Sequence, residues 1–248
     1  MFVSNLKPKI SAVLFDWDAT IVHTEESVKL SIEETISSIS NSENYDEDIK
    51  KSENLLHLPS EKIFEEIYGE GETADVATKK FDEAFKKNHL IDLELIEGAK
   101  EVIKKLKDND IPYAIISNKK QDLLEEEIDL LIPELKPDII SGAKDGQKKK
   151  PDAEPVIKVL EEMKIPKTNY KDVIFVGDSY SDLGAAVNSG VKPYVFGNSN
   201  RDELLENPKE ITTAGSKISN LDSTEKGHAD THQDLLKYID KSLSVRSR

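Results

Sequence analysis

Short, evenly apolar runs recur along the chain, separated by longer segments that carry apolar residues on one helical face. The runs are too short and too evenly apolar for amphipathic helices, so they predict buried strands. They lie at residues 12–15, 111–116, 138–140, 172–176 and 191–196. The segments that predict helices lie at residues 98–109, 119–131, 153–163, 181–190 and 231–243. Alternating strands and helices indicate an α/β fold, with a Rossmann-like parallel sheet and helices on both faces.

One long interval, residues 22–92, departs from this alternation and contains no convincing strand. Its helix-like pieces lie at residues 24–40, 60–68 and 73–88. Helices inserted after the first strand predict a small α-helical cap domain at 23–92, beside an α/β catalytic core made of 1–22 and 93–248. One long crossover decorated by helices is the alternative. Residues 197–230 are rich in Gly, Ser, Asn and Asp, and we expect mostly loop there.

The composition narrows the classes of function. The 248 residues carry a net charge of −15, which argues against nucleic acid or an anionic membrane surface as a partner. There are no cysteines, which excludes disulfides, thiolate chemistry and sulfur-ligated zinc. The N-terminus lacks an apolar stretch long enough for a signal peptide, and no run approaches the roughly 18 apolar residues that cross a bilayer. We expect a soluble, cytoplasmic protein, with a monomer as the default.

Polar side chains follow four of the predicted elements, where each strand or its loop ends. These residues are Asp16, Asp18, Ser117, Asn118, Lys150, Asp178 and Asp182. In parallel α/β sheets, ligands bind at the carboxyl ends of the strands, so these side chains should meet at one edge. The edge would then combine carboxylates, a hydroxyl, an amide and an ammonium.

This set of chemical groups indicates phosphoryl transfer. Crowded carboxylates need a hard cation, and ligands that are all oxygen favour magnesium. An aspartate beside the metal can attack phosphorus and form an aspartyl-phosphate, while a second carboxylate two residues later can move the proton. Hydroxyl and ammonium groups suit the phosphoryl oxygens, where charge must be held in the transition state.

The same residues carry a resemblance to a known family. In chain order they lie in the segments VLFDWDAT, AIISNK, KKKPDAEP and VIFVGDSYSD. Together these resemble the four motifs of the haloacid dehalogenase (HAD) superfamily of phosphohydrolases, and most closely its phosphoglycolate phosphatase-like branch, in which a helical cap follows the first motif. The resemblance covers residues 1–22 and 93–240, whereas the cap matches only in position and helicity.

The resemblance implies roles for four acidic residues. Asp16 would be the nucleophile, and Asp18 the general acid/base. The magnesium site would comprise Asp16, Asp18 (through its backbone carbonyl), Asp178 and Asp182. The sequence leaves an alternative for Asp182, which could instead cap or brace a helix. Asp18 also disfavours the dehalogenase branch, because that branch lacks this acid.

The remaining motif residues are implied to handle the phosphoryl group. Thr20 would support the loop beside the phosphate, and Ser117 and Asn118 would bind it. Lys150 would hold both the nucleophile and the phosphoryl group. Considered alone, the Ser117-Asn118 pair is also typical of a helix N-cap.

Three residues of the first motif and its exit raise further expectations. Ala19 stands where many family members have glycine, and His23 stands where an acidic residue is common. Neither departure removes a catalytic role. Trp17 could pack in the core or against the cap, and the sequence slightly favours the cap.

The leading hypothesis is therefore a magnesium-dependent phosphatase that hydrolyses a small phosphorylated metabolite, such as a phosphoglycolate-like compound or a sugar phosphate. A β-phosphoglucomutase-like phosphomutase is the alternative within the same chemistry, although the cap shows no clear match to the residues that guide such mutases. A phospho-receiver signalling domain or a catalytically silent binding protein would be a different class. Asp18, the downstream GDSYSD segment and the inserted helices disfavour the receiver.

Overall fold

The computed structural model describes residues 10–39, 44–56, 58–197 and 227–243. The chain divides into two compact units, one formed by residues 1–22 and 95–248 and the other by residues 23–94. We call these the core unit and the inserted unit and describe each by itself. The inserted unit ends at residue 94, compared with 92 in the sequence prediction.

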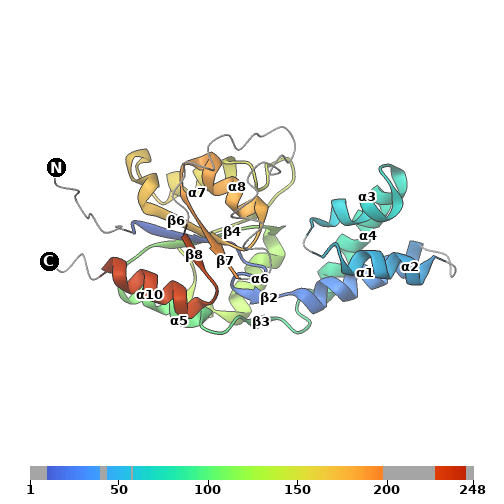
Figure 1. The fold of residues 1–248 in the computed structure, drawn as a ribbon, viewed down its shortest axis with the longest axis horizontal. Helices are drawn as coiled ribbons and strands as arrows, with labels where there is room; N and C mark the ends of the chain where they lie inside the picture. Colours follow the sequence, from blue (N-terminus) through green and yellow to red (C-terminus); the bar gives the residue numbers. More distant parts are fainter. Residues whose placement is uncertain (1–9, 40–43, 57, 198–226, 244–248) are drawn as a thin grey trace. The chain divides into compact units, whose positions relative to one another are not determined.

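The core unit is built on a six-stranded sheet in which every pairing is parallel (Figure 1). Its strands are β1 (Ala12–Phe15), β4 (Tyr113–Lys120), β5 (Ile139–Ala143), β6 (Val173–Gly177), β7 (Lys192–Phe196) and β8 (Gly227–Ala229). The strand order is β5-β4-β1-β6-β7-β8, so β1 lies between β4 and β6. The chain moves from β1 to β4 and β5 on one side, and later to β6 and β7 on the other side. The carboxyl end of β1 is therefore a topological switch point, where α/β sheets bind ligands.

Helices cover both faces of this sheet, with α7 and α8 on one face and α5 and α10 on the other (Figure 1). The helices of the core unit are α5 (Ala99–Asp108), α6 (Gln121–Leu131), α7 (Glu154–Glu162), α8 (Tyr180–Ser189) and α10 (His232–Leu243), with 3-10 turns at Pro133–Leu135 and Lys167–Asp172. Alternate residues of a strand point to opposite faces, and Leu14 of β1 accordingly packs with Val156 of α7 and Ala186 of α8. The sheet is thus buried between two helical layers, as its evenly apolar strands predicted.

The described residues of the inserted unit form four helices around an apolar cluster of their own. The helices are α1 (Glu25–Ile39), α2 (Tyr45–Glu53), α3 (Ser60–Tyr68) and α4 (Glu72–Asn88). Ile36 of α1, Phe64 of α3 and Phe81 of α4 lie in that cluster. A short two-stranded sheet pairs β2 (Val22–His23) with β3 (Glu94–Leu95), the segments that enter and leave the unit. Within the described residues, no helix is long and apolar enough to cross a membrane.

The predicted α/β class is confirmed, and each predicted strand overlaps an observed one. Three details were wrong. Strand β2 lies in the interval 22–92, where no strand was predicted. The helix expected from residue 119 begins at Gln121, because β4 continues through its polar end to Lys120 and pairs there with Ala143 of β5. Helix α2 lies between the predicted helices at 24–40 and 60–68, where no helix was predicted, and its acidic first turn and basic last turn favour a helix through the macrodipole. Strand β8 falls in the expected 197–230 loop; residues 198–226 of that segment lie outside the described residues.

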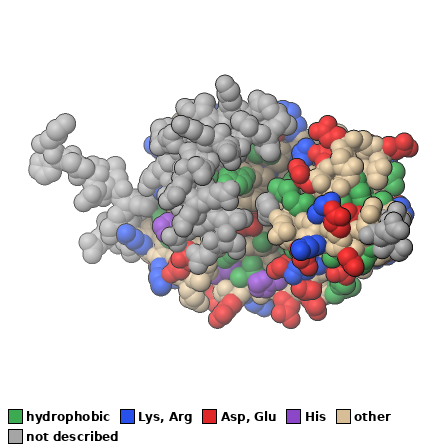
Figure 2. Space-filling view, turned by 45° about the vertical axis from the view of Figure 1, so that its right-hand side comes forward, with side chains coloured by type: hydrophobic (Ala, Val, Ile, Leu, Met, Phe, Trp, Pro, Cys, Tyr) green, Lys and Arg blue, Asp and Glu red, His purple; other side chains and the backbone are tan. Residues whose placement is uncertain are grey.

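The surface carries the chain's negative charge in a dispersed form. Asp and Glu side chains are spread over the face seen in Figure 2, with Lys and Arg side chains among them. Many pair at helical spacing, as Glu25 and Lys29 do at 2.8 Å. Such exposed pairs contribute little to stability, so the fold depends on the buried clusters.

Truncation of a central core side chain should show this dependence. Leu14 is fully buried between the sheet and the α7–α8 layer, and Leu14→Ala should lower the free energy of unfolding by about 2–5 kcal/mol. Leu130→Ala is the matched control, because that side chain is 59% exposed and its truncation should cost less than about 0.5 kcal/mol. Urea unfolding followed by circular dichroism measures both. Equal shifts in the two variants would contradict the assignment of the core.

Candidate active site

The segment that follows β1 forms a tight turn at the carboxyl edge of the sheet. Its first residue, Asp16, is tied to the neighbouring strand because its N–H donates to the carbonyl of Val176 at 2.9 Å. The carbonyl of Trp17 then accepts the N–H groups of Ile21 and Val22, at 2.8 and 3.1 Å. Ala19 has a φ of 55°, in the left-handed region that glycine adopts with less strain. The turn thereby fixes the backbone of both aspartates.

Lys150 is the centre of the buried polar cluster at this edge. Its Nζ lies 2.5 Å from Asp16 Oδ1 and 2.6 Å from Asp182 Oδ1, and all three side chains are buried. Lys150 comes from the loop after β5, Asp16 from the end of β1 and Asp182 from α8. One ammonium group therefore joins three separate parts of the core unit.

Asn118, at the polar end of β4, positions the backbone that carries Lys150. Its Nδ2 donates to the Lys150 carbonyl at 3.0 Å, and its Oδ1 accepts the Lys150 N–H at 2.9 Å. This reciprocal pair fixes the loop after β5 against β4. Both polar atoms of the Asn118 side chain are engaged in holding the loop. The phosphate contact predicted for Asn118 stays a prediction.

Strand β6 and helix α8 deliver Asp178 and Asp182. Ser179 caps α8 in a reciprocal capping box, in which its N–H donates to Asp182 Oδ2 at 3.1 Å. Gly177 is required at this corner, since a Cβ there would come within 2.4 Å of the Asp182 side chain. Thr20 reaches the same corner, and its hydroxyl donates to Asp178 Oδ1 at 3.4 Å. The helix cap that was the alternative for Asp182 is thus present, and its predicted metal role stays a prediction.

Three carboxylates at this edge could hold a metal ion. Asp16, Asp178 and Asp182 each offer an oxygen, and these atoms lie within 4.8 Å of one another. Ligands that are all oxygen suit a hard divalent cation such as magnesium. Together with Lys150, the three ionised carboxylates leave a local net charge of −2, which a divalent ion would cancel. The donor set therefore fits such an ion.

The pKa values of these groups reflect the same excess of negative charge. Burial, followed by the charge of Asp182, raises the pKa of Asp16 well above its usual value, although Lys150 opposes the shift. Burial and the charge of Asp182 likewise raise the pKa of Asp178 to about 7. Burial would lower the pKa of Lys150, but Asp16 and Asp182 outweigh it and raise that pKa. Lys150 therefore stays charged, while the carboxylates resist ionising together.

Asp18 lies at the same edge and has a separate set of partners. Its Oδ2 accepts a hydrogen bond from the Ser117 hydroxyl at 3.4 Å, and its Oδ1 lies 2.7 Å from the Nζ of Lys119. The structure therefore connects Asp16 to Lys150 and Asp18 to Lys119. The two aspartates that follow β1 are each matched with a different lysine.

Sequence reasoning missed Lys119, which contacts Asp18, and Glu127, which contacts both Lys119 and Trp17. Lys119 and Glu127 are both buried, and Lys119 Nζ lies 2.6 Å from Glu127 Oε2. Trp17 is fully buried and donates its indole N–H to Glu127 at 2.6 Å, while its expected contact with the cap stays a prediction. Glu127 had a visible signal, because it lies on the apolar face of α6 between Leu124 and Ile128. A charged residue on a buried helix face requires a partner.

Comparisons with known proteins find one family match, several relatives and similar folds. A family model described as haloacid dehalogenase-like hydrolase matches residues 13–196. A protein of Caldanaerobacter subterraneus named pyrophosphatase PpaX is 28% identical over 185 residues, which are 74% of this chain and 80% of the relative. A phosphoglycolate phosphatase of Aquifex aeolicus is 26% identical over 181 residues, with 73% and 81% covered. The crystal structure of a haloacid dehalogenase-like hydrolase from Bacteroides fragilis has the same fold, with a TM-score of 0.68, 19% identity and coverage of 89% and 96%.

The raised carboxylate pKa values predict how stability depends on pH when divalent metal is removed with EDTA. A carboxyl whose pKa is higher in the folded than in the unfolded state stabilises the fold below its unfolded pKa, and this stabilisation is lost as pH rises through the folded pKa. For Asp178 that window runs from its ordinary value of 3.8 up to about 7. The free energy of unfolding should therefore fall between pH 5 and 8.5, by on the order of a few kcal/mol.

Chemical denaturation of two variants isolates this effect. Asp178→Asn removes a titrating group from the cluster, so it should flatten the fall and be more stable than the wild type at pH 8.5. Asp108→Asn, which changes an exposed side chain of α5, should keep the wild-type slope. A wild-type stability that is constant or rises across this range would contradict the proposed crowding of carboxylates.

Proposed function

Because the chain belongs to the haloacid dehalogenase-like hydrolase family, we propose that it is a magnesium-dependent phosphatase that acts through an aspartyl-phosphate on Asp16. Its substrate would be a small phosphorylated metabolite, either phosphoglycolate-like or a sugar phosphate. The observation that carries the proposal is the buried Asp16–Lys150–Asp182 cluster at the carboxyl edge of the sheet, with Asp178 beside it. Curated relatives named as phosphatases support the reaction class.

The first half of the reaction would form the covalent intermediate. A carboxylate oxygen of Asp16 attacks the phosphorus atom, and the bond from phosphorus to the leaving oxygen breaks. Asp18 donates a proton to that oxygen, so the product departs as an alcohol. Lys150 holds Asp16 Oδ1 through its ammonium group during this step. The same ammonium can also face a phosphoryl oxygen and stabilise its negative charge.

The second half would return the enzyme to its starting state. Asp18, now ionised, takes a proton from a water molecule, and the oxygen of that water attacks the phosphorus atom. The bond between phosphorus and Asp16 breaks, which restores the carboxylate and releases inorganic phosphate. The separate partners of the two aspartates support this division of roles, since Asp16 contacts Lys150 whereas Asp18 contacts Ser117 and Lys119.

The remaining motif residues would hold the phosphoryl group and the metal. Ser117 and Thr20 offer hydroxyl groups at this edge, and Asn118 keeps the Lys150 loop in place. The side chains of Asp16, Asp178 and Asp182, together with the backbone carbonyl of Asp18, would hold magnesium, which when bound supplies positive charge for the phosphoryl oxygens.

Replacing the nucleophile tests the proposal. Asp16→Asn keeps the size of the side chain but removes the attacking carboxylate, so turnover should fall by at least about 10³-fold. Phosphate release measures it, with p-nitrophenyl phosphate, 2-phosphoglycolate, pyrophosphate and sugar phosphates as substrates, in magnesium and in EDTA. Pyrophosphate is included because a relative is named as a pyrophosphatase.

The exposed variant Asp108→Asn is the control for Asp16→Asn and should retain full turnover. Wild-type activity that survives in Asp16→Asn would overturn the mechanism. Isomerised sugar phosphate in place of free phosphate would identify a phosphomutase instead.

A further inference from the structure

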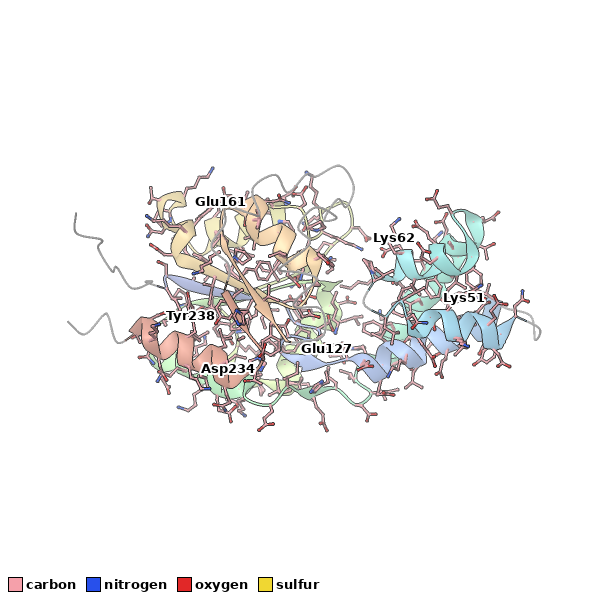
Figure 3. All side chains as sticks on the ribbon, viewed as in Figure 1. Lys51, Lys62, Glu127, Glu161, Asp234 and Tyr238 are labelled. Carbon is pink, nitrogen blue, oxygen red and sulfur yellow. The ribbon has the colours of Figure 1, made fainter. Side chains whose placement is uncertain are left out.

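A second buried lysine lies behind Asp18 and is held by a fully buried glutamate. Lys119 Nζ lies 2.8 Å from Glu127 Oε1 and 2.6 Å from Oε2, so both oxygens of that carboxylate accept from one ammonium. The side chain of Lys119 is 3% exposed, and that of Glu127 is 0% exposed. Glu127, labelled in Figure 3, belongs to α6, whereas Lys119 belongs to the end of β4.

The ammonium of Lys119 also forms an ion pair with Asp18. Both oxygens of Glu127 accept hydrogen bonds from the same ammonium. The Nζ atom also lies 2.7 Å from Asp18 Oδ1. Burial would lower the pKa of Lys119, but the charges of Asp18 and Glu127 outweigh it and raise that pKa. Lys119 is therefore a cation whose position is set by Glu127 on α6.

The two oxygens of Asp18 differ because of this contact. Oδ1, the atom beside Lys119, is buried, although the side chain as a whole is 33% exposed. The accessible oxygen is therefore Oδ2, which also accepts the hydrogen bond from Ser117. Lys119 holds Oδ1 inside the protein and leaves Oδ2 as the atom at which a proton can be exchanged with a reactant.

Trp17 also contacts Glu127. Its indole N–H donates to Glu127 Oε2 at 2.6 Å, and the ring is fully buried. Glu127 therefore contacts the residue between the two aspartates and also anchors the lysine that contacts Asp18. The orientation of the Asp16–Asp18 segment is thus coupled to a carboxylate on α6.

We propose that Lys119, anchored by Glu127, is a positioning residue for Asp18 that orients Oδ2 for proton transfer. The inference rests on the proposed phosphatase function, because it assigns the support for the general acid/base of that reaction. A purely structural ion pair is the competing explanation. Replacing both partners of a buried pair often preserves stability, whereas removing one partner leaves an uncompensated charge, so the two explanations can be separated.

The test uses four variants of the full chain: Lys119→Met, Glu127→Gln, the double variant with both changes, and Glu126→Gln. Glu126 is the exposed neighbour of Glu127 on α6 and gives the matched control. Urea unfolding reports stability, and steady-state turnover of 2-phosphoglycolate and p-nitrophenyl phosphate reports activity. Trp17 is the single tryptophan of the chain, so intrinsic fluorescence reports whether its contact with Glu127 has changed.

Lys119→Met should lower steady-state turnover by about 10–100-fold, because a misplaced acid/base loses part of the 10²–10⁴-fold that such groups supply. A rapid burst of nitrophenolate should persist, since this good leaving group departs with little need of a proton and only the later hydrolysis of the phosphoenzyme is slowed. Glu127→Gln should shift the tryptophan emission and reduce turnover in the same direction. Glu126→Gln should match the wild type in every measurement.

The double variant decides between the two explanations. Its stability should recover relative to Lys119→Met, because the fully buried Glu127 charge that this variant leaves unpaired is gone, while its turnover should stay low. Turnover that recovers together with stability, or Lys119→Met turnover equal to the wild type, would overturn the positioning role. Failure of the proposed function itself would look different: the wild type would then show neither a burst nor a difference from Asp16→Asn.

Discussion

The ammonium of Lys150, buried between Asp16 and Asp182, is the interaction on which the candidate site depends. It joins the end of β1, the loop after β5 and the first turn of α8, elements that are far apart in the sequence. An isolated carboxylate could not remain ionised at this depth, and one cation does not satisfy three of them. The edge of the sheet is therefore arranged for additional positive charge, which a divalent ion would supply.

A second buried lysine, Lys119, likewise contacts two carboxylates. Lys119 contacts Asp18 as Lys150 contacts Asp16, and each lysine is shared with a further buried carboxylate, Glu127 or Asp182. Two aspartates separated by one residue would repel each other if left alone. Here each has its own cation, which gives the pair two distinct environments. The carboxylates still outnumber the two buried lysines, so this edge needs further positive charge before a phosphate can be held there.

The sequence predicted the sheet and most of the edge because both leave local signals. Evenly apolar runs mark buried strands, and a polar residue directly after such a run marks its end, as Asp16 does after β1. The misses have equally physical reasons. Helix α2 lacks a strong apolar stripe, and the Lys119–Glu127 pair joins β4 to α6 through a contact that only tertiary packing creates. Glu127 on an apolar helix face was a readable sign that a buried cation had to lie nearby.

The central claim is that the carboxylate of Asp16 is the atom group that accepts the phosphoryl group. The most direct measurement is to quench the enzyme during turnover, reduce any acyl phosphate with borohydride, and locate the modified residue by tandem mass spectrometry. The account predicts homoserine at position 16 and an unmodified aspartate at 18, 178 and 182. Reduction at one of those other positions, or continued turnover with no trapped intermediate, would contradict it.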